Sequence, residues 1–280
     1  MDNPETATRL DPRDYLARIG FTTPEHMDFQ RPSLILLQAL HEAHMLAVPF
    51  ENLSIHYGQP IVLRNELLCD KIVRRRRGGF CYELNGMFAW LLRQLEYRVT
   101  LLSAEVAESG GNFSPAYDHL ALLVHDVDGT DRLADVGFGD SFRRPLRMDP
   151  CVEQGGGDGY IYRLRVGQNR DHAQTERVQF PYWLVERYGS DSGVQWELVY
   201  RFTLRPHVLT DFTERCIFQQ TSPDSHFTQK RICSLALPDG RISLSDLRLI
   251  TARGGKREER MLASEDEYQT VLADHFGIVI

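Results

Sequence analysis

The chain has 280 residues, which is enough for one large domain or two to three packed modules. Hydrophobic residues make up 42% of the chain and charged residues 25%, the proportions of an ordinary globular protein. The formal net charge of −7 argues against a general nucleic-acid-binding protein, because such proteins carry a basic surface.

Secreted, membrane-spanning and zinc-ribbon proteins are also disfavoured. The start of the chain, Met1 to Leu10, is polar and lacks the apolar core of a signal peptide, and no window comes near the roughly eighteen apolar residues of a membrane span. The five cysteines are odd in number and form no C-x-x-C pair. We therefore expect a soluble, reduced, cytoplasmic protein with neither a disulfide framework nor a metal site.

The first hundred residues are predicted to be mostly helical. Asp11 and Pro12 form the pattern of an N-cap followed by proline at the first helical position, and Gly20 ends that helix. Ser33 begins a second helix, with apolar residues at helical spacing behind it. The segment Val48–Leu53 contains a proline and an aromatic residue, and is predicted to be neither a helix nor a simple linker.

The stretch Arg77–Asn85 reads Arg-Gly-Gly-Phe-Cys-Tyr-Glu-Leu-Asn. Apolar residues recur at helical spacing from Leu84 to Leu95, so Cys81 is predicted in the first turn of a helix that follows a glycine turn. There the unpaired N–H groups and the helix dipole favour the thiolate. The competing interpretation is a small buried core cysteine, which is the commoner state of a free cysteine.

Four consecutive arginines, Arg74–Arg77, precede this motif. Such a run occurs in nucleic-acid patches and localisation signals. On an acidic chain it is more often a solvated helix end with one structural ion pair. We expect Arg77 to pair with Glu83.

From Tyr97 onward the sequence changes to the alternation of strands. Asp128 and Gly129 are a hairpin signal, and the run of three glycines at 155–157 is predicted to be a loose hairpin tip rather than a phosphate-binding loop. The predicted strands suggest a barrel-like β region and cover residues 98–105, 119–124, 132–136, 160–166, 178–185 and 196–204.

The last third mixes helices and strands. Thr210 is predicted to cap a short helix, strands at 232–237 and 242–250 flank a turn at Pro238, and Ser264 caps a terminal amphipathic helix. We therefore predict an α+β fold with three closely packed parts. These are the mostly helical first hundred residues, the barrel-like β region and the mixed last third.

A nucleophilic cysteine needs a base, and the base needs an acceptor that orients it. Folding the predicted hairpin evenly about Val127 sets His119 opposite Asp135, a register that needs a bulge or a longer turn. Apolar residues flank Asp135, which favours a buried, paired carboxylate. A solvent-facing acid on an edge strand is an equal alternative.

The other histidines fit a metal site poorly. His41 and His44 are three residues apart on a predicted helix, but no zinc-site pattern accompanies them. We expect them, with His56 and His125, to be ordinary surface or core side chains.

Taken together, these segments resemble the arylamine N-acetyltransferases. The Cys81 motif is followed by Asp-His-Leu-Ala-Leu-Leu-Val from Asp118 and by Asp-Val-Gly-Phe-Gly from Asp135. The segments 48–53 and 221–227 also match, and the resemblance covers essentially the whole chain. It implies a helical domain that carries Cys81 (1–96), a β-barrel domain that carries the histidine and the aspartate (97–205) and an α/β lid (206–280), with a transglutaminase-like (cysteine-protease-like) core.

The resemblance also implies a Cys81–His119–Asp135 triad. This triad would take an acetyl group from acetyl-CoA and pass it to an arylamine or hydrazine by a ping-pong mechanism, through an S-acetyl-cysteine, as in xenobiotic metabolism. Acetyl-CoA would be a co-substrate, with no tightly bound cofactor. The implied acceptor-pocket residues are Phe50, Phe138 and Gly139, and the implied CoA contacts are Gly137 and Ser225. The glycines before Cys81 are expected to leave space beside its sulfur for a thioester.

Two features depart from the family pattern. Asp224 and His226 stand where some members carry hydroxyl residues near the CoA phosphates, and Asp224 would repel a phosphate. The interdomain insertion of the vertebrate relatives is absent between Trp183 and Trp196, which predicts a more open acceptor cleft.

Two other functions stay open. The same triad suits an amide synthase or acyltransferase that uses another acyl-CoA or a carrier-bound acyl donor. A binding protein that keeps the fold without turnover is the third hypothesis, although all three triad positions retain reactive residue types.

Overall fold

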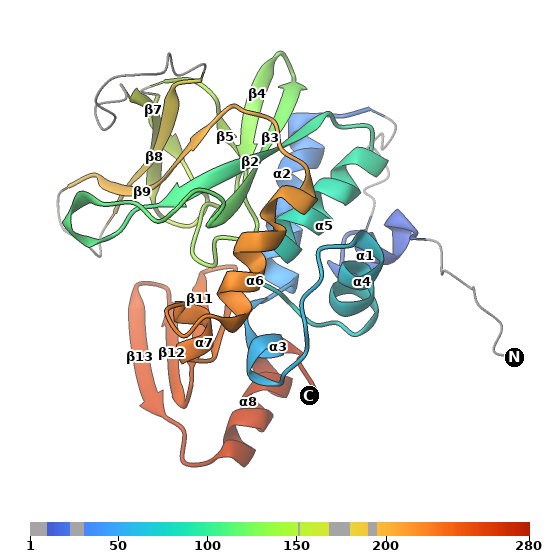
Figure 1. The fold of residues 1–280 in the computed structure, drawn as a ribbon, viewed down its shortest axis with the longest axis vertical. Helices are drawn as coiled ribbons and strands as arrows, with labels where there is room; N and C mark the ends of the chain where they lie inside the picture. Colours follow the sequence, from blue (N-terminus) through green and yellow to red (C-terminus); the bar gives the residue numbers. More distant parts are fainter. Residues whose placement is uncertain (1–9, 23–30, 151, 168–179, 190–194) are drawn as a thin grey trace, which may run out of the picture.

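A computed structural model of the chain describes residues 10–22, 31–150, 152–167, 180–189 and 195–280. It places the helices of the first third beside an eight-stranded sheet, with a five-stranded sheet and the last helix next to them (Figure 1). Cys151, the beginning of the strand predicted at 178–185, and residues 190–194, within the stretch where the interdomain insertion is expected to be absent, lie outside the described residues. Within the described ranges, none of the helices has both the length and the apolar character needed to cross a bilayer.

The helical part follows the predicted caps. The carboxylate of Asp11 accepts the Arg13 N–H, and the hydroxyl of Ser33 accepts the Leu36 N–H, so both predicted N-caps are confirmed. The segment that was predicted to be neither helix nor linker contains a short strand. The elements of this part are α1 (Pro12–Arg18), α2 (Leu34–Ala47), β1 (Phe50–Glu51), α3 (Leu53–His56), α4 (Asn65–Cys69), the π-helix η1 (Asp70–Arg74) and α5 (Cys81–Gln94).

The eight-stranded sheet is antiparallel throughout, in the order β5-β4-β3-β2-β9-β8-β7-β6. A bridge between Pro150 and Leu164 brings the chain after β5 against β7, so the sheet nearly closes into the predicted barrel. Its strands are β2 (Val99–Val106), β3 (His119–Val127), β4 (Thr130–Ala134), β5 (Leu146–Arg147), β6 (Gln154–Gly155), β7 (Ile161–Gly167), β8 (Tyr182–Tyr188) and β9 (Glu197–Thr203), with a 3-10 turn η2 (Ser109–Gly111) after β2.

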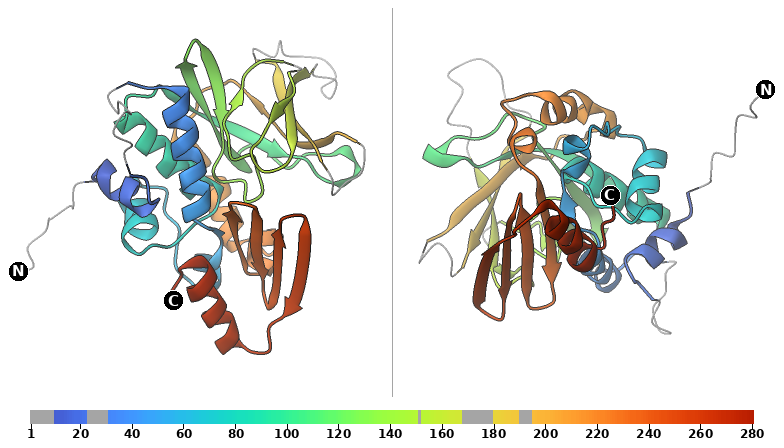
Figure 2. Two further views of the ribbon diagram at one scale, coloured as in Figure 1. Left: turned by 180° about the vertical axis from the view of Figure 1, so that it is seen from behind. Right: turned by 90° about the horizontal axis from the view of Figure 1, so that it is seen from below.

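The five-stranded sheet has the order β1-β10-β11-β12-β13, so a strand from the helical part pairs with the last third of the chain. The helix α8 (Glu265–Phe276) lies across one face of this sheet (Figure 2) and begins at the predicted cap Ser264. The strands are β10 (Ile232–Leu237), β11 (Gly240–Ser245), β12 (Arg248–Arg253) and β13 (Lys256–Met261).

Three predictions for the last third need correction. The range 242–250 contains the end of β11, a turn and the start of β12 rather than one strand. The strand β13 was not predicted at all. Thr210 is not a helix cap, because a 3-10 turn η3 (Leu209–Phe212) comes first, and the Asp211 carboxylate accepts the Val208 N–H in its place. The helices after it are α6 (Thr213–Thr221) and α7 (His226–Gln229).

The strand β3 is buried on both faces. Leu120, Leu122 and Val124 pack into the core formed by the helices, whereas Ala121 and Leu123 pack into the barrel. The helices and the barrel therefore both pack against β3, and His119 is the first residue of this strand. The predicted boundaries at residues 96 and 205 stay predictions.

Candidate active site

A cavity of about 590 Å³ lies where α5, β3 and the α6–α7 segment meet. Its wall brings together five segments of the chain that are separated in sequence. The lining residues are Phe50, Cys81, Val106, Ala107, Glu108, Ser109, Ser114, Asp118, His119, Gly137, Phe138, Gln219, His226 and Phe227.

Cys81 is the first residue of α5, as the sequence predicts. The Phe80 N–H before it donates to the Glu83 carboxylate at 3.1 Å, which satisfies one of the free donors at this helix end. Cys81 is only 4% exposed and packs in the helical core, yet it also lines the cavity. Cys81 is therefore buried, as the core-cysteine interpretation expects, and it also faces a cavity, as a nucleophile requires.

The two glycines before Cys81 do not make room for a thioester, so that expectation is wrong. A Cβ atom on Gly78 would lie 1.9 Å from the carbonyl oxygen of Pro49, and one on Gly79 would lie 2.7 Å from the carboxylate of Glu83. Neither glycine has a positive φ. Their missing side chains let this turn pack directly against β1 and the start of α5.

The charged groups behind this turn form two buried ion pairs. Lys71 Nζ lies 2.8 Å from Glu83, and Arg77 Nη2 lies 2.9 Å from Glu51. The expected Arg77–Glu83 pair is wrong, because the turn carries Arg77 toward β1 and leaves Glu83 facing η1. The arginine run nevertheless contributes one buried ion pair, the one between Arg77 and Glu51.

His119 and Asp135 form the contact that the sequence predicts. His119 Nε2 lies 2.8 Å from Asp135 Oδ2, and the carboxylate is fully buried. Asp135 Oδ1 accepts the side-chain N–H of Asn85 at 2.8 Å and the backbone N–H of Gly137 at 3.0 Å. Burial alone would raise the pKa of Asp135, but His119 and these donors together lower it below its usual value. The solvent-facing alternative is excluded.

The pairing register that led to this prediction is wrong by two residues. Leu122 pairs with Ala134, and a bulge lies between Val124 and Val127, so Asp135 follows the end of β4 rather than facing His119 directly. A shift by two residues keeps a side chain on the same face of a sheet. His119 therefore reaches Asp135 along the diagonal.

His41 supports Asp135 from behind, a role that the sequence did not suggest. Its Nε2 accepts the backbone N–H of Asp135 at 3.1 Å, and its Nδ1 lies 2.8 Å from the carbonyl oxygen of Arg143. Burial lowers the pKa of His41 to about 4, so the ring is neutral and donates from Nδ1. The prediction of a core histidine holds, but the backbone partners come from a segment that no sequence pattern links to α2.

The surroundings of Cys81 oppose its ionisation. Burial raises the pKa of the Cys81 thiol well above its usual value, and the carboxylate of Asp118 raises it further. That carboxylate is held by Arg215 Nε at 2.7 Å and Gln219 Nε2 at 2.5 Å, both from α6. These effects oppose the one expected from the start of α5, so a thiolate at Cys81 stays a prediction.

Aromatic side chains form much of the cavity wall. The Phe138 and His119 rings meet edge-on with their centroids 5.1 Å apart, and the ring centroids of Phe50 and Phe227 are 6.1 Å apart. Gly137 is required by space, since a Cβ atom there would lie 2.9 Å from the Cα atom of Cys81. Phe50, Phe138 and Gly137 thus line the cavity, and their predicted substrate and CoA contacts stay predictions.

Gly139 and Ser225 do not line this cavity. Gly139 adopts a φ of +90°, and its carbonyl oxygen accepts a hydrogen bond from Arg241. Ser225 is buried, where its hydroxyl caps α7 by accepting the Phe227 N–H and donates to Gln219. Of the two residues that depart from the family pattern in this loop, His226 lines the cavity and Asp224 is exposed outside it. The substrate and CoA contacts of these residues stay predictions.

Comparisons with known proteins point to one family. A family model described as N-acetyltransferase matches residues 33–280. The arylamine N-acetyltransferase, pineal gland isozyme NAT-3, of Gallus gallus is 33% identical over 97% of this chain and 95% of its own. The arylamine N-acetyltransferase of Nocardia farcinica has a TM-score of 0.82 at 33% identity, over 98% of this chain and 92% of its own. That of Mycobacterium marinum in complex with CoA has a TM-score of 0.80 at 30% identity, over 96% and 93%.

Proposed function

Because the chain belongs to the arylamine N-acetyltransferase family, we propose that it moves an acetyl group from acetyl-CoA to an arylamine or hydrazine through an S-acetyl intermediate on Cys81. The observation that carries this mechanism is the placement of three side chains. Cys81 and His119 share one cavity, and His119 is held by the buried carboxylate of Asp135. This is the nucleophile, base and orienting acid that covalent catalysis needs.

In the first half-reaction, His119 Nδ1 accepts the proton of the Cys81 thiol, since Nε2 is engaged by Asp135. The thiolate attacks the carbonyl carbon of the thioester. The carbon–sulfur bond to CoA then breaks, and the CoA thiolate leaves with the proton from His119. Asp135 stabilises the imidazolium that forms in between, because its carboxylate stays ionised.

In the second half-reaction, the amine nitrogen attacks the acetyl carbon of the S-acetyl group. His119 accepts a proton from that nitrogen and returns it to the Cys81 sulfur as the carbon–sulfur bond breaks. The aromatic wall of Phe50, Phe138 and Phe227 supports this step in two ways. It favours flat arylamines, and it limits the access of water to the thioester.

The cytoplasm is the proposed site of action. Cys69, Cys216 and Cys233 are buried and free of disulfides, as is usual in a reducing compartment.

Mass spectrometry tests the intermediate. Incubation with acetyl-CoA and no amine is expected to add one acetyl group to the protein, and Cys81→Ala is expected to abolish the addition. Cys69→Ala is the control, because Cys69 is a buried cysteine outside the cavity. An unmodified Cys81 in the native protein would refute the mechanism. Modification by another acyl donor but not by acetyl-CoA would instead favour the amide synthase or acyltransferase function.

A further inference from the structure

The wall of the candidate active-site cavity carries an unbalanced negative charge. Two of its lining residues, Glu108 and Asp118, are carboxylates, and the described residues that line it include neither lysine nor arginine. The Asp118 carboxylate is neutralised by Arg215, whose Nε lies 2.7 Å away. The Glu108 side chain is exposed and makes no ion pair with any residue that the structure describes. The uncompensated charge of this wall is therefore that of Glu108.

A closed loop fixes the backbone from which Glu108 projects. The loop follows the end of β2, and the Glu108 N–H donates to the carbonyl oxygen of Asn112 at 2.9 Å. At its base the Ser114 N–H donates to the carbonyl oxygen of Val106 at 2.9 Å, and the Ser114 hydroxyl accepts the Val106 N–H at 2.8 Å. Ser114 is only 5% exposed. These contacts hold Glu108 in place as a part of the cavity wall.

The cavity has a buried base and an exposed mouth. Cys81 is 4% exposed and His119 is 2% exposed, whereas Glu108 and His226 on the same wall are exposed. The reacting nitrogen of an acceptor has to reach Cys81, so the far end of a flat acceptor points outward, toward the mouth. The volume of about 590 Å³ leaves space for a substituent on the aromatic ring. Such a substituent comes to the part of the cavity where Glu108 lies.

We propose that Glu108 is a specificity-determining residue, which favours arylamines with a positively charged substituent remote from the reacting nitrogen and disfavours those with a carboxylate there. This inference rests on the proposed function, because it concerns the acceptor of the same site. A carboxylate at the mouth of a cavity attracts a cation and repels an anion, and apolar walls focus its field. Since Glu108 is exposed, the effect of each charge is modest.

Two acceptors that differ in the charge of one substituent test this role. The substituent of 4-aminobenzyltrimethylammonium is a fixed cation, and that of 4-aminophenylacetate is an anion at a similar distance from the aromatic amine. The readout is release of the CoA thiol from acetyl-CoA, at about pH 8, where imidazole side chains are ordinarily uncharged. An ionic strength of about 0.01 M keeps the Debye length near about 30 Å. In the proposed two-step mechanism, kcat/KM for the acceptor reports the second half-reaction alone.

The measured quantity is the cation preference, defined as kcat/KM for the cationic acceptor divided by kcat/KM for the anionic one. Comparing this ratio between proteins cancels the intrinsic reactivities of the two amines. The cation preference should fall about fivefold in Glu108→Gln and about twenty-fivefold in Glu108→Lys. The first variant removes one unit of charge and the second changes two, so the second factor is the square of the first. Because the Glu108 side chain is exposed, we expect both variants to fold, which circular dichroism checks.

Glu258→Lys is the matched control, since Glu258 is exposed on β13 and lies outside the cavity. It changes the net charge as Glu108→Lys does, and the cation preference should stay within about twofold of the native value. An unaltered preference in Glu108→Lys, or an equal change in Glu258→Lys, would overturn the role of Glu108. The uncharged acceptor 4-methylaniline reports the proposed function by itself. If the native protein does not acetylate it, the proposed function fails and this inference with it, whereas acetylation of 4-methylaniline with an unaltered preference refutes the role of Glu108 alone.

Discussion

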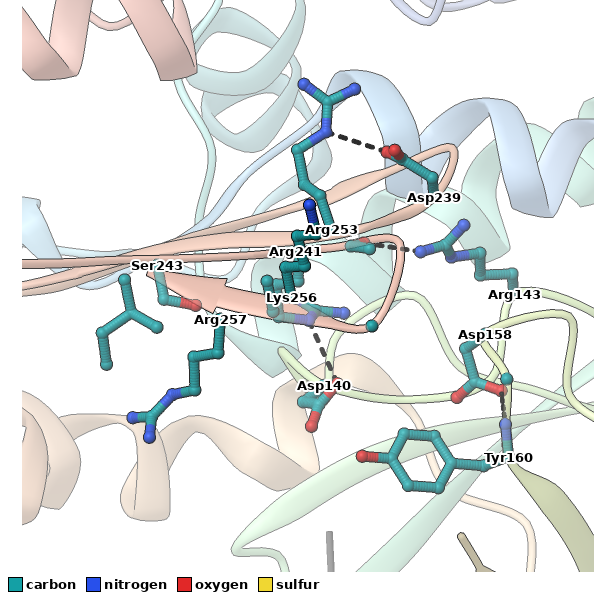
Figure 3. Close-up of a pocket in the computed structure, with 15 residues that line it drawn as sticks. Asp140, Arg143, Asp158, Tyr160, Asp239, Arg241, Ser243, Arg253, Lys256 and Arg257 are labelled. Atoms are coloured by element: carbon teal, nitrogen blue, oxygen red, sulfur yellow. Dashed lines mark hydrogen bonds and ion pairs between the residues drawn. The ribbon is translucent and has the colours of Figure 1, made fainter. Parts of the chain in front are cut away.

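The cavity of the candidate active site and a second cavity, of about 480 Å³, on the other side of Gly139 differ in how completely their polar groups are paired. The second lies between the barrel and the five-stranded sheet (Figure 3). At the first, Asp135 holds His119 and accepts two N–H groups, and His41 accepts the Asp135 N–H. At the second, the Nε of Arg143 has no hydrogen-bond partner among the residues that the structure describes. A site whose dipoles are already in place can stabilise a transient charge without rearrangement.

The largest effect is expected from Asp135→Asn, because it removes the charge that stabilises the His119 imidazolium. We expect kcat/KM for acetyl transfer to fall by about a thousandfold or more, with the fold retained. Steady-state kinetics and circular dichroism check the two parts of this prediction. Asp140→Asn is the comparison at the second cavity, and it should change kcat/KM far less. Similar losses of kcat/KM in the two variants would show that the charge of Asp135 has no special role in catalysis.

Gly137→Ala is expected to have the next largest effect. The added Cβ atom would lie 2.7 Å from Asn85 Nδ2 and 2.9 Å from the Cα atom of Cys81, so both must move. We expect a loss of stability of about 1–3 kcal/mol from overpacking and a fall in kcat of about a hundredfold from displacement of the nucleophile. Chemical denaturation measures the loss of stability, and steady-state kinetics measure the fall in kcat. Gly155→Ala is the control, since open space surrounds Gly155. A fully active Gly137→Ala enzyme would contradict the close packing of this site.

How much of this structure the sequence predicts depends on the range of the interactions. The caps at Asp11, Ser33 and Ser264 were predictable because their partners lie two or three residues away. The His119–Asp135 contact was reached through a hairpin, although the bulge shifted its register. The family motif identified Cys81, where the periodicity alone favoured a core residue.

The elements and contacts that the sequence did not predict have physical explanations. The strand β13 reads Lys-Arg-Glu-Glu-Arg-Met and lacks alternation, because it is an exposed edge strand with no buried face. The partner of Glu83 is Lys71, which η1 brings from behind the helix. At the second cavity, Arg143 donates to the backbone carbonyls of Pro238 and Gly240, about a hundred positions later in the chain. No sequence pattern encodes such contacts of a side chain with distant backbone.

A smaller effect is expected from Asp118→Asn, which sharpens the description of the first cavity. Its carboxylate raises the pKa of the Cys81 thiol, so removing that charge makes the thiol easier to ionise. The rise of kcat/KM with pH, which reports ionisation of the nucleophile, should therefore move to lower pH. A pH–rate profile with p-nitrophenyl acetate measures this. Asp224→Asn, outside the cavity, should leave the profile in place. A shift of the Asp118→Asn profile to higher pH would contradict this role of Asp118.

The smallest effect is expected from salt, and it tests how far the first cavity is shielded from solvent. Raising the ionic strength from about 0.01 M to about 0.15 M shortens the Debye length from about 30 Å to about 8 Å, which screens exposed charges far more than buried ones. The His119–Asp135 pair is buried, whereas the side chain of Arg257 at the second cavity is 62% exposed. Turnover of p-nitrophenyl acetate, an uncharged donor, should therefore change by less than about twofold over this range, in the native protein and in Arg257→Gln alike. A severalfold loss of turnover with salt in the native protein would mean that exposed charges support the histidine.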